Sequence, residues 1–235
     1  MNKNEFIKEL ELLGIKLSDE QLNKLEIYCE FLLEYNKHTN LTAIKEKEQV
    51  YLKHFYDSLT IVKAIDLSKY SNLLDIGTGA GFPGMVIKIV FPELEITLLD
   101  SNNKKIKFLQ ELSKKLNLNK INFYHGRAEE FCQKNRESFD IVTARAVSNM
   151  STLSELCIPL VKKEGYFIAL KGSNIEELKE ANNGIKKLGG IVEKNVILSL
   201  PIEDSQRHII VIKKIEKTPN IYPRRYEKII KNPLK

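Results

Sequence analysis

The chain has 235 residues, 43% of them apolar, which is enough to bury the core of one sizeable domain with a small attachment. No apolar run approaches the roughly 18 residues of a membrane-spanning helix, and the polar N-terminus lacks a secretory apolar segment, so we expect a cytoplasmic protein without membrane contact. The cysteines and histidines show no metal-binding spacing, so we expect three reduced thiols in or near the core and no metal site.

The net charge of +6 is distributed unevenly. Residues 213–235 contain eight lysines and arginines and two acidic residues, so this segment carries the whole excess. A basic C-terminal tail, which we place at residues 215–235, suggests a polyanionic partner, and nucleic acid is favoured over a membrane. A solubilising tail without a partner is an equally open interpretation.

Residues 1–65 are predicted to form a helical extension. A first helical face runs from Phe6 to Leu13 and ends at Gly14. A capping box at residues 18–21 begins a second helix. A third helical run covers residues 50–62, after a polar connection.

From residue 72 the pattern changes to alternating strands and helices. We place the central domain at residues 66–214 and expect it to form one compact unit with the two flanking segments. Short apolar strands are predicted at residues 73–76, 95–100, 120–124, 139–144, 165–170, 192–200 and 208–213. Helices are predicted at residues 83–90, 103–116, 151–161 and 176–188. Repeated strand–helix units indicate a parallel sheet covered on both faces. The last two strands have no helix between them, which indicates a hairpin with one antiparallel strand.

A glycine-rich loop follows the first strand. Gly77, Gly79 and Gly81 allow a sharp turn and the close approach of a ligand at the carboxyl end of the strand. Residues 79–84 formally fit the dinucleotide fingerprint GxGxxG, which alone is a weak signal. Asp75 would repel a pyrophosphate and would suit a cationic ligand with an amino group and a sulfonium. The spacing DxGxGxG is that of methyltransferases, so S-adenosyl-L-methionine is the expected cofactor.

Two further acidic residues fall in register with the loop. Asp100 ends the second strand and can accept hydrogen bonds from ribose hydroxyls, which supports any adenosyl cofactor. Glu129 follows the third strand, in a loop that borders the adenine in a methyltransferase sheet. A solvated acid at a helix start is the alternative for Glu129. An NAD-dependent oxidoreductase and a methyltransferase-fold RNA-binding protein without catalysis remain as rival functions.

Several motifs together resemble the bacterial family of small-subunit rRNA methyltransferase G, also called glucose-inhibited division protein B. The resemblance covers residues 36–234, and its most specific parts are the Gly-Phe-Pro-Gly ending of the loop and the Tyr-Pro-Arg-Arg tail. The motifs, in chain order, are Asn36-x-x-x-Asn40-Leu-Thr42, His54-x-x-Asp57-Ser58-Leu59, Asp75-Ile-Gly-Thr-Gly-Ala-Gly-Phe-Pro-Gly84, Leu99-Asp-Ser101, Arg127-Ala-Glu129, Arg145-Ala-Val147, Lys171-Gly172, Tyr222-Pro-Arg-Arg225 and Lys231-Asn-Pro-Leu234.

The resemblance implies a class I, Rossmann-like α/β fold with a mostly parallel seven-stranded sheet. It also implies methylation of N7 of one guanine, equivalent to guanine-527, in the 16S rRNA of the small ribosomal subunit. Gly77 and Phe82 would line the cofactor site, Ala128 and Glu129 would contact the adenosine end, and Arg145 would lie beside the reacting methyl group. A monomer is the family expectation. Thr78, where serine is commoner, and Tyr226-Glu-Lys, where the family often has glycine, depart from the pattern.

Guanine N7 has an exposed lone pair, so the reaction needs no general base and depends on holding N7 in line with the methyl group. Arg145 and Lys171 follow the fourth and fifth strands, and we expect one of them to position the base or its phosphate. A structural salt bridge is the alternative for each. The tail cations expected to grip rRNA phosphates are Arg224, Arg225, Lys228 and Lys231.

Overall fold

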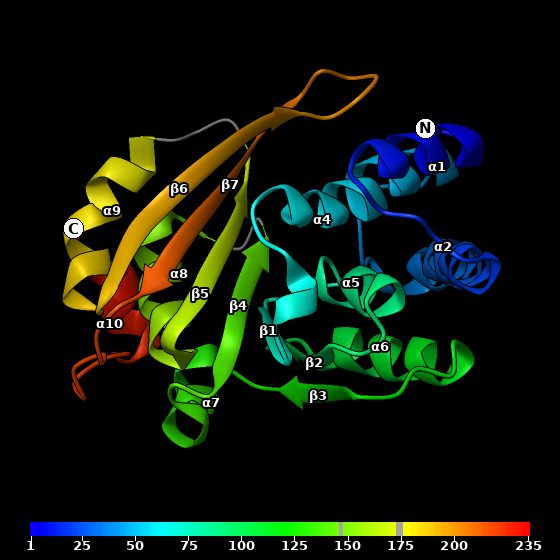
Figure 1. Cartoon of the computed structure of the whole chain (residues 1–235). Coiled ribbons are helices and arrows are strands. Elements are labelled where there is room, and N and C mark those ends of the chain that lie inside the picture. The colour runs from blue at the N-terminus through cyan, green and yellow to red at the C-terminus, as the bar shows by residue number, and fades with distance from the viewer. Residues whose placement is uncertain (146–147, 173–175) are drawn as a thin grey trace.

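The computed structural model describes residues 1–145, 148–172 and 176–235, so two residues of the Arg145-Ala-Val147 motif lie outside the described part. The described residues form a seven-stranded sheet of order β3-β2-β1-β4-β5-β7-β6 (Figure 1). The strands are β1 (Asn72–Ile76), β2 (Glu95–Asp100), β3 (Ile121–His125), β4 (Phe139–Arg145), β5 (Val161–Lys171), β6 (Gly190–Ser199) and β7 (Gln206–Lys214).

Strands β1 to β5 pair in parallel, and β7 is antiparallel to both of its neighbours, β5 and β6. The predicted mostly parallel sheet with one antiparallel strand is therefore confirmed. The antiparallel direction has a consequence for the site. The beginning of β7 lies beside the end of β5, where His208 pairs with Lys171.

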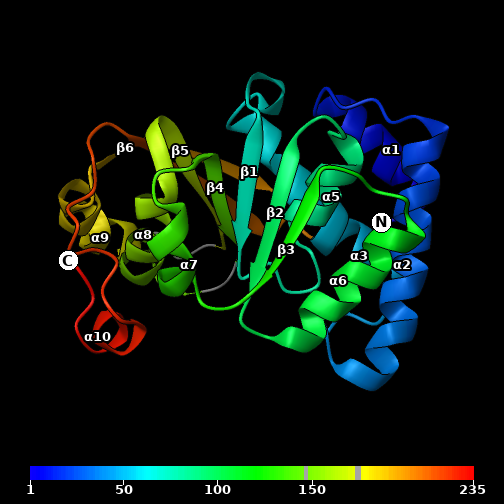
Figure 2. The ribbon, with the colours of Figure 1, turned by 90° about the horizontal axis from the view of Figure 1, so that it is seen from below.

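Helices cover both faces of the sheet (Figure 2). The main α-helices are α1 (Lys3–Leu12), α2 (Asp19–Thr39), α5 (Gly84–Val90), α6 (Asn103–Lys115), α7 (Ala128–Asn135), α8 (Met150–Cys157), α9 (Glu176–Lys187) and α10 (Tyr226–Lys231). Two short α-helical segments, α3 (Lys47–Val50) and α4 (Asp57–Leu59), flank a π-helical segment, Tyr51–Tyr56. Within the described residues no helix is both long and apolar enough to span a membrane.

The sheet separates two hydrophobic clusters because successive side chains of a strand point to opposite faces. Leu73 of β1 joins the cluster that contains α5, α6 and the N-terminal helices. Leu74 joins the cluster beneath α7, α8, α9 and α10. All three cysteines are free and buried, as expected for thiols in the core.

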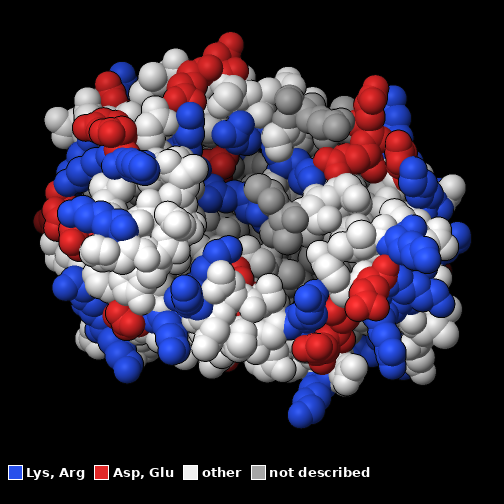
Figure 3. Space-filling view, turned by 180° about the vertical axis from the view of Figure 1, so that it is seen from behind, with Lys and Arg blue, Asp and Glu red and all other residues white. Residues whose placement is uncertain are grey.

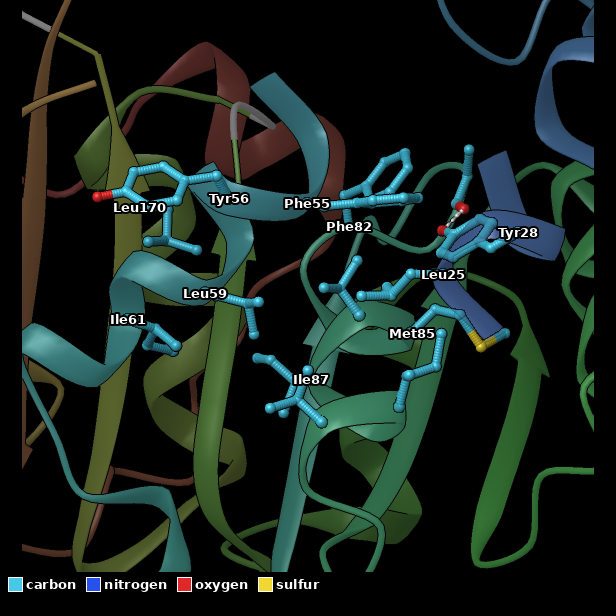
Figure 4. Close-up of a cluster of buried hydrophobic side chains, with 14 of the residues drawn as sticks. Leu25, Tyr28, Phe55, Tyr56, Leu59, Ile61, Phe82, Met85, Ile87 and Leu170 are labelled. Atoms are coloured by element: carbon cyan, nitrogen blue, oxygen red, sulfur yellow. Dashed lines mark hydrogen bonds between the residues drawn. The ribbon is translucent and has the colours of Figure 1, made fainter. Parts of the chain in front are cut away.

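The N-terminal helices share the first cluster with the sheet domain. Figure 4 shows the rings of Tyr28 of α2 and Phe55 of the π-helical segment near the ring of Phe82 in the glycine loop. The ring of Phe82 stacks on that of Tyr28, with 5.5 Å between centroids, and lies 6.2 Å from that of Phe55. Residues 1–65 are therefore continuous with the core and not an appendage on its surface.

Three local features differ from the sequence prediction. The helix expected at residues 151–161 ends at Cys157 and gives way to a 3-10 turn, Ile158–Leu160, because Pro159 lacks the N–H that would continue an α-helix. Helix α7 was not predicted as an element. The third helical run is widened by the π-helical segment, which periodicity alone does not reveal.

The C-terminal segment, residues 215–235, packs against the sheet domain. It contains α10, and Ile229 is fully buried in the second cluster together with partly buried Tyr222, Tyr226 and Leu234. These apolar residues pack the segment onto α8 and α9. The basic residues of the segment lie between these apolar residues in the sequence. The segment 215–235 is therefore part of the folded body.

Candidate functional site

Asp75, near the end of β1, holds the glycine loop in place by hydrogen bonds. Its Oδ2 accepts hydrogen bonds from the Thr78 hydroxyl at 2.6 Å and from the Gly84 backbone at 2.9 Å. The side chain is fully buried, and its Oδ1 has no hydrogen-bond partner among the described residues. Burial raises the pKa of Asp75 to about 7, although the bonds from Thr78 and Gly84 oppose that shift. The buried carboxyl group of Asp75 therefore ties the end of β1 to the glycine loop and to the start of α5.

The glycines of the loop have different roles. Gly77 and Gly79 adopt positive φ angles of 66° and 62°, which favour glycine, and both line a cavity. A Cβ atom on Gly81 would lie 2.6 Å from the Tyr28 hydroxyl, and one on Gly84 would lie 2.4 Å from Leu98. Gly81 and Gly84 are therefore required for packing, whereas Gly77 and Gly79 leave room for a ligand.

The glycine-loop cavity, of about 420 Å³, lies between this loop, the end of β2 and the N-terminal region. Asp100 lines it. One Asp100 oxygen accepts from the Gly79 backbone at 2.9 Å and the other from the Asn102 backbone at 2.8 Å. Each carboxylate oxygen retains a lone pair, so Asp100 can still accept from a hydroxyl in the cavity.

A smaller cavity of about 110 Å³, the α7 cavity, continues from the glycine-loop cavity, since Gly77 and Ser101 line both. Ala128 and Glu129, at the start of α7, line it, and burial raises the pKa of Glu129. Tyr226 of the C-terminal segment forms another wall. The structure thus brings most of the sequence-predicted cofactor residues to two connected cavities, whereas Asp75 and Gly81 line neither.

Arg145, at the end of β4, is held by the N-terminal region. Its Nη1 donates to the Lys53 carbonyl at 2.9 Å and to Asp57 at 3.1 Å, and its Nη2 lies 3.1 Å from Nδ1 of His54. The guanidinium also lies 5.1 Å from the centre of the Phe82 ring. Arg145 is therefore fixed in place by an ion pair and two hydrogen bonds.

The protonation of His54 follows from these contacts. A guanidinium can only donate, so His54 Nδ1 accepts from Arg145, and Nε2 carries the proton that is donated to the Thr42 hydroxyl at 2.9 Å. Burial, together with the charge of Arg145, lowers the pKa of His54 to about 3. The ring stacks on Phe82 with 4.2 Å between centroids. His54 is thus a neutral, oriented ring.

A third cavity of about 380 Å³, the β7 cavity, lies on the other side of Arg145. His54 and Arg145 line both this cavity and the glycine-loop cavity. Arg207 and His208 of β7 also line it, and Arg207 Nε donates to Asp57 at 3.0 Å. Figure 3 shows a hollow near the middle of the face seen from behind, with Lys and Arg side chains gathered around it.

Lys171, at the end of β5, also lines the β7 cavity but is held in place. Its Nζ donates to the Ser148 carbonyl at 2.7 Å and forms an ion pair with Glu177 at 3.0 Å. The alternative of a salt bridge considered for Lys171 is therefore present in the structure. A positioning role for Lys171 remains a prediction.

The basic residues of the C-terminal segment divide into two groups. Arg224 makes a two-pronged ion pair with Glu155, a fully buried side chain, at 2.8 and 2.6 Å. Its guanidinium anchors the segment to α8, so the expected grip on phosphate does not extend to Arg224 in this arrangement. Arg225, Lys228 and Lys231 are exposed.

Sequence reasoning gave no role to several side chains that meet here. The residues concerned are Tyr28, Thr42, His54, Asp57, Arg207, His208 and Tyr226. Three of them, Thr42, His54 and Asp57, lie in motifs that resemble the family, but the spacing of these motifs does not indicate a role for the side chains. The antiparallel direction predicted for the last strand was the available signal for His208, because it places the start of that strand at the ligand-binding edge.

The chain is similar throughout its length to known proteins. A family model described as rRNA small subunit methyltransferase G matches residues 21–210. The ribosomal RNA small subunit methyltransferase G of Bacillus velezensis is 52% identical over 96% of this chain and 95% of its own length, and that of Halalkalibacterium halodurans is 51% identical over both full lengths.

Solved structures support the fold at low identity. TrmN from Thermus thermophilus is 17% identical, with a TM-score of 0.50 over 62% of this chain and 44% of its own. TYW2 from P. horikoshii in complex with MeSAdo is 14% identical, with a TM-score of 0.51 over 61% of this chain and 56% of its own. The chain belongs to the rRNA small subunit methyltransferase G family.

Proposed function

We propose that the chain transfers a methyl group from S-adenosyl-L-methionine to N7 of a guanine in 16S rRNA of the small ribosomal subunit. The observation that carries this proposal is the pair of cavities that meet at Arg145 and His54. The donor would occupy the glycine-loop cavity and its α7 extension, and the guanine would enter the β7 cavity. Family membership removes the reason for considering an oxidoreductase.

The residues present fit this cofactor. Its ribose would meet Asp100, its adenine would lie near Ala128 and Glu129, and its amino group would find the carbonyls and acidic groups around Gly77. Asp75, which lines neither cavity, would act through the loop that it holds. When bound, the cofactor supplies an electrophilic methyl group on a positively charged sulfur.

The protein's own residues would orient the reactants and avoid adverse charge. N7 needs no deprotonation, so no general base is required. Methylation makes the purine cationic, and an unpaired cation nearby would oppose the reaction. The neutral ring of His54 adds no charge at the junction of the cavities, and Asp57 pairs with both Arg145 and Arg207 and so offsets part of their positive charge. These contacts also hold His54 and Arg145 in place.

We place the RNA along the cations that surround the β7 cavity and on the exposed cations of the C-terminal segment, Arg225, Lys228 and Lys231. Such contacts neutralise phosphates and give salt-dependent affinity with little sequence information. We expect the protein to act in the cytoplasm.

The decisive experiment uses labelled S-adenosylmethionine with small subunits from cells that lack the enzyme. Label recovered in 16S rRNA as 7-methylguanosine supports the proposal, and an absence of label supports the rival, a non-catalytic RNA-binding protein. The same assay with naked rRNA and whole ribosomes identifies the true substrate. Calorimetry with S-adenosylhomocysteine and with NAD checks which cofactor binds.

A further inference from the structure

His208 lies near the beginning of β7. The antiparallel direction of this strand places its beginning at the ligand-binding edge of the sheet. Because β7 runs antiparallel to β5, His208 pairs with Lys171 at the end of β5. The neighbouring end of β4 carries Arg145. All three residues line the β7 cavity, so His208 faces the same space as the held guanidinium.

The imidazole of His208 combines burial with an unused hydrogen-bonding atom. The residue is only 3% exposed, and its Nε2 has no hydrogen-bond partner within the part of the chain that the structure describes. Buried polar side-chain atoms nearly always have a partner, so an unpaired one beside a cavity indicates a ligand. The residue is therefore arranged for a molecule that enters the β7 cavity.

Asn195 of β6 determines which proton His208 presents. The amide nitrogen of Asn195 lies 3.1 Å from His208 Nδ1, and the amide oxygen lies 3.3 Å from it. Asn195 therefore holds the ring through Nδ1, and with the Asn195 amide nitrogen as the donor, Nδ1 accepts and Nε2 carries the ring proton. His208 thus presents a hydrogen-bond donor to the cavity.

The four cationic side chains that line the β7 cavity are already in ion pairs. Lys53 pairs with Glu203, and Arg207 pairs with Asp57. Arg145 donates to Lys53, Asp57 and His54, and Lys171 is paired with Glu177. A guanine that is methylated at N7 must be held through O6 while N7 stays free, which excludes the usual two-pronged contact of an arginine to both atoms. A single ring N–H meets this requirement.

We propose that His208 Nε2–H donates to O6 of the target guanine and selects guanine over adenine, with Asn195 as the positioning residue. Adenine carries an amino group at this position, and its hydrogens would oppose the His208 proton. The proposal rests on the proposed function, because it assumes that the base enters the β7 cavity.

The test uses small subunits reconstituted with 16S rRNA that carries guanosine, 2-aminopurine riboside or inosine at the target position. 2-Aminopurine lacks O6, whereas inosine keeps O6 and lacks the 2-amino group. Single-turnover rates with labelled S-adenosylmethionine are measured for the wild-type protein, His208→Leu and His208→Gln. We expect wild-type protein to prefer guanosine over 2-aminopurine more strongly than His208→Leu does, by about tenfold or more.

Comparing the preferences cancels differences in intrinsic reactivity between the two bases. The preference for guanosine over inosine should be the same in both proteins. His208→Gln, which keeps an N–H donor, should recover part of the lost preference, and Asn195→Ala should lose part of it. Unchanged affinity for S-adenosylhomocysteine confirms that each variant is folded.

If His208→Leu slows guanosine and 2-aminopurine equally, His208 is only structural and the inference is overturned. If wild-type protein leaves guanosine-containing subunits unlabelled, the proposed function itself fails. The two failures are therefore distinguishable in one assay.

Discussion

The two segments that flank the sheet domain reach the site in different ways. The N-terminal residues 1–65 carry nine lysines against eleven acidic residues, a net charge of −2, yet they supply the polar network of His54 and Asp57 that fixes Arg145 between two cavities. Residues 213–235 carry the whole charge excess, yet Arg224 in this region is tied to Glu155, and the region contributes the ring of Tyr226 to a cavity.

This difference shows that charge composition and functional contact are separate properties. A net charge describes what a surface attracts, whereas buried polar contacts describe what a site positions. Under the proposed function, the N-terminal helices would therefore position the reactants, and the C-terminal segment would both form a wall of the cofactor site and present exposed cations to RNA. Four substitutions test this division.

Arg224→Met should destabilise the protein most. It leaves the fully buried carboxylate of Glu155 without its partner, and breaking a buried ion pair in this way lowers the free energy of unfolding by about 3–5 kcal/mol. Urea denaturation measures this loss. Because Tyr226 lines the α7 cavity, the affinity for S-adenosylhomocysteine should also fall in calorimetry. Lys228→Met, at an exposed position, is the control and should change either quantity little.

An unchanged cofactor affinity in Arg224→Met would show that the C-terminal segment serves RNA alone. Of the two flanking segments, only the N-terminal one would then contribute to the active site.

Arg145→Lys should impair methyl transfer while retaining the charge. A lysine cannot make the forked contacts to Lys53 and Asp57 together with the contact to His54, and losing one such charge-assisted contact is worth about 1.5–3 kcal/mol. The single-turnover rate should therefore fall about 10- to 100-fold. A parallel unfolding measurement separates catalysis from stability. A rate equal to that of the wild type would mean that only the charge is needed.

His54 should make stability depend on pH. Its pKa is lowered to about 3 in the folded protein against 6.5 in the unfolded chain, so the unfolded chain takes up the proton first as the pH falls. The stabilisation is fully present above pH 6.5 and is lost between pH 6.5 and 3, with a slope of at most about 1.4 kcal/mol per pH unit.

Unfolding free energies of wild-type protein and His54→Gln across this range measure the effect, and the variant should show the shallower dependence. The exposed His38→Gln serves as the control. Identical slopes for all three proteins would argue against a neutral, buried His54.

Tyr28→Phe should have the smallest effect. The Tyr28 hydroxyl donates to the Ala80 carbonyl at 2.5 Å, which ties α2 to the glycine loop (Figure 4). Its removal should lower the free energy of unfolding by about 1 kcal/mol and weaken S-adenosylhomocysteine binding slightly. Tyr70→Phe is the control, since the Tyr70 hydroxyl makes no hydrogen bond within residues 1–145, 148–172 and 176–235. A loss in stability without any loss in affinity would separate α2 from the cofactor site.

Periodicity and local chemistry were sufficient to predict much of the molecule. Alternating strands and helices predicted the sheet and its antiparallel strand, and the loop from Asp75 to Gly84 with Asp100 predicted the ligand-binding edge. These features depend on residues close together in the chain, and local sequence determines them. Helix α7, the π-helical segment and α10 were missed because packing, and not periodicity, decides them.

The side chains that meet at the site were decided only by the tertiary structure. Arg207 and Asp57 are 150 residues apart, and Arg224 and Glu155 are 69 apart, so no spacing in the sequence reveals either pair. The sequence alone predicted the glycine-rich loop as a cofactor site, but the structure shows that Asp75 holds this loop by hydrogen bonds and does not line the cavity. The sequence by itself determined the family and the cofactor edge. The burial of charges in pairs, and the antiparallel direction of β7, decided which residues can position a base.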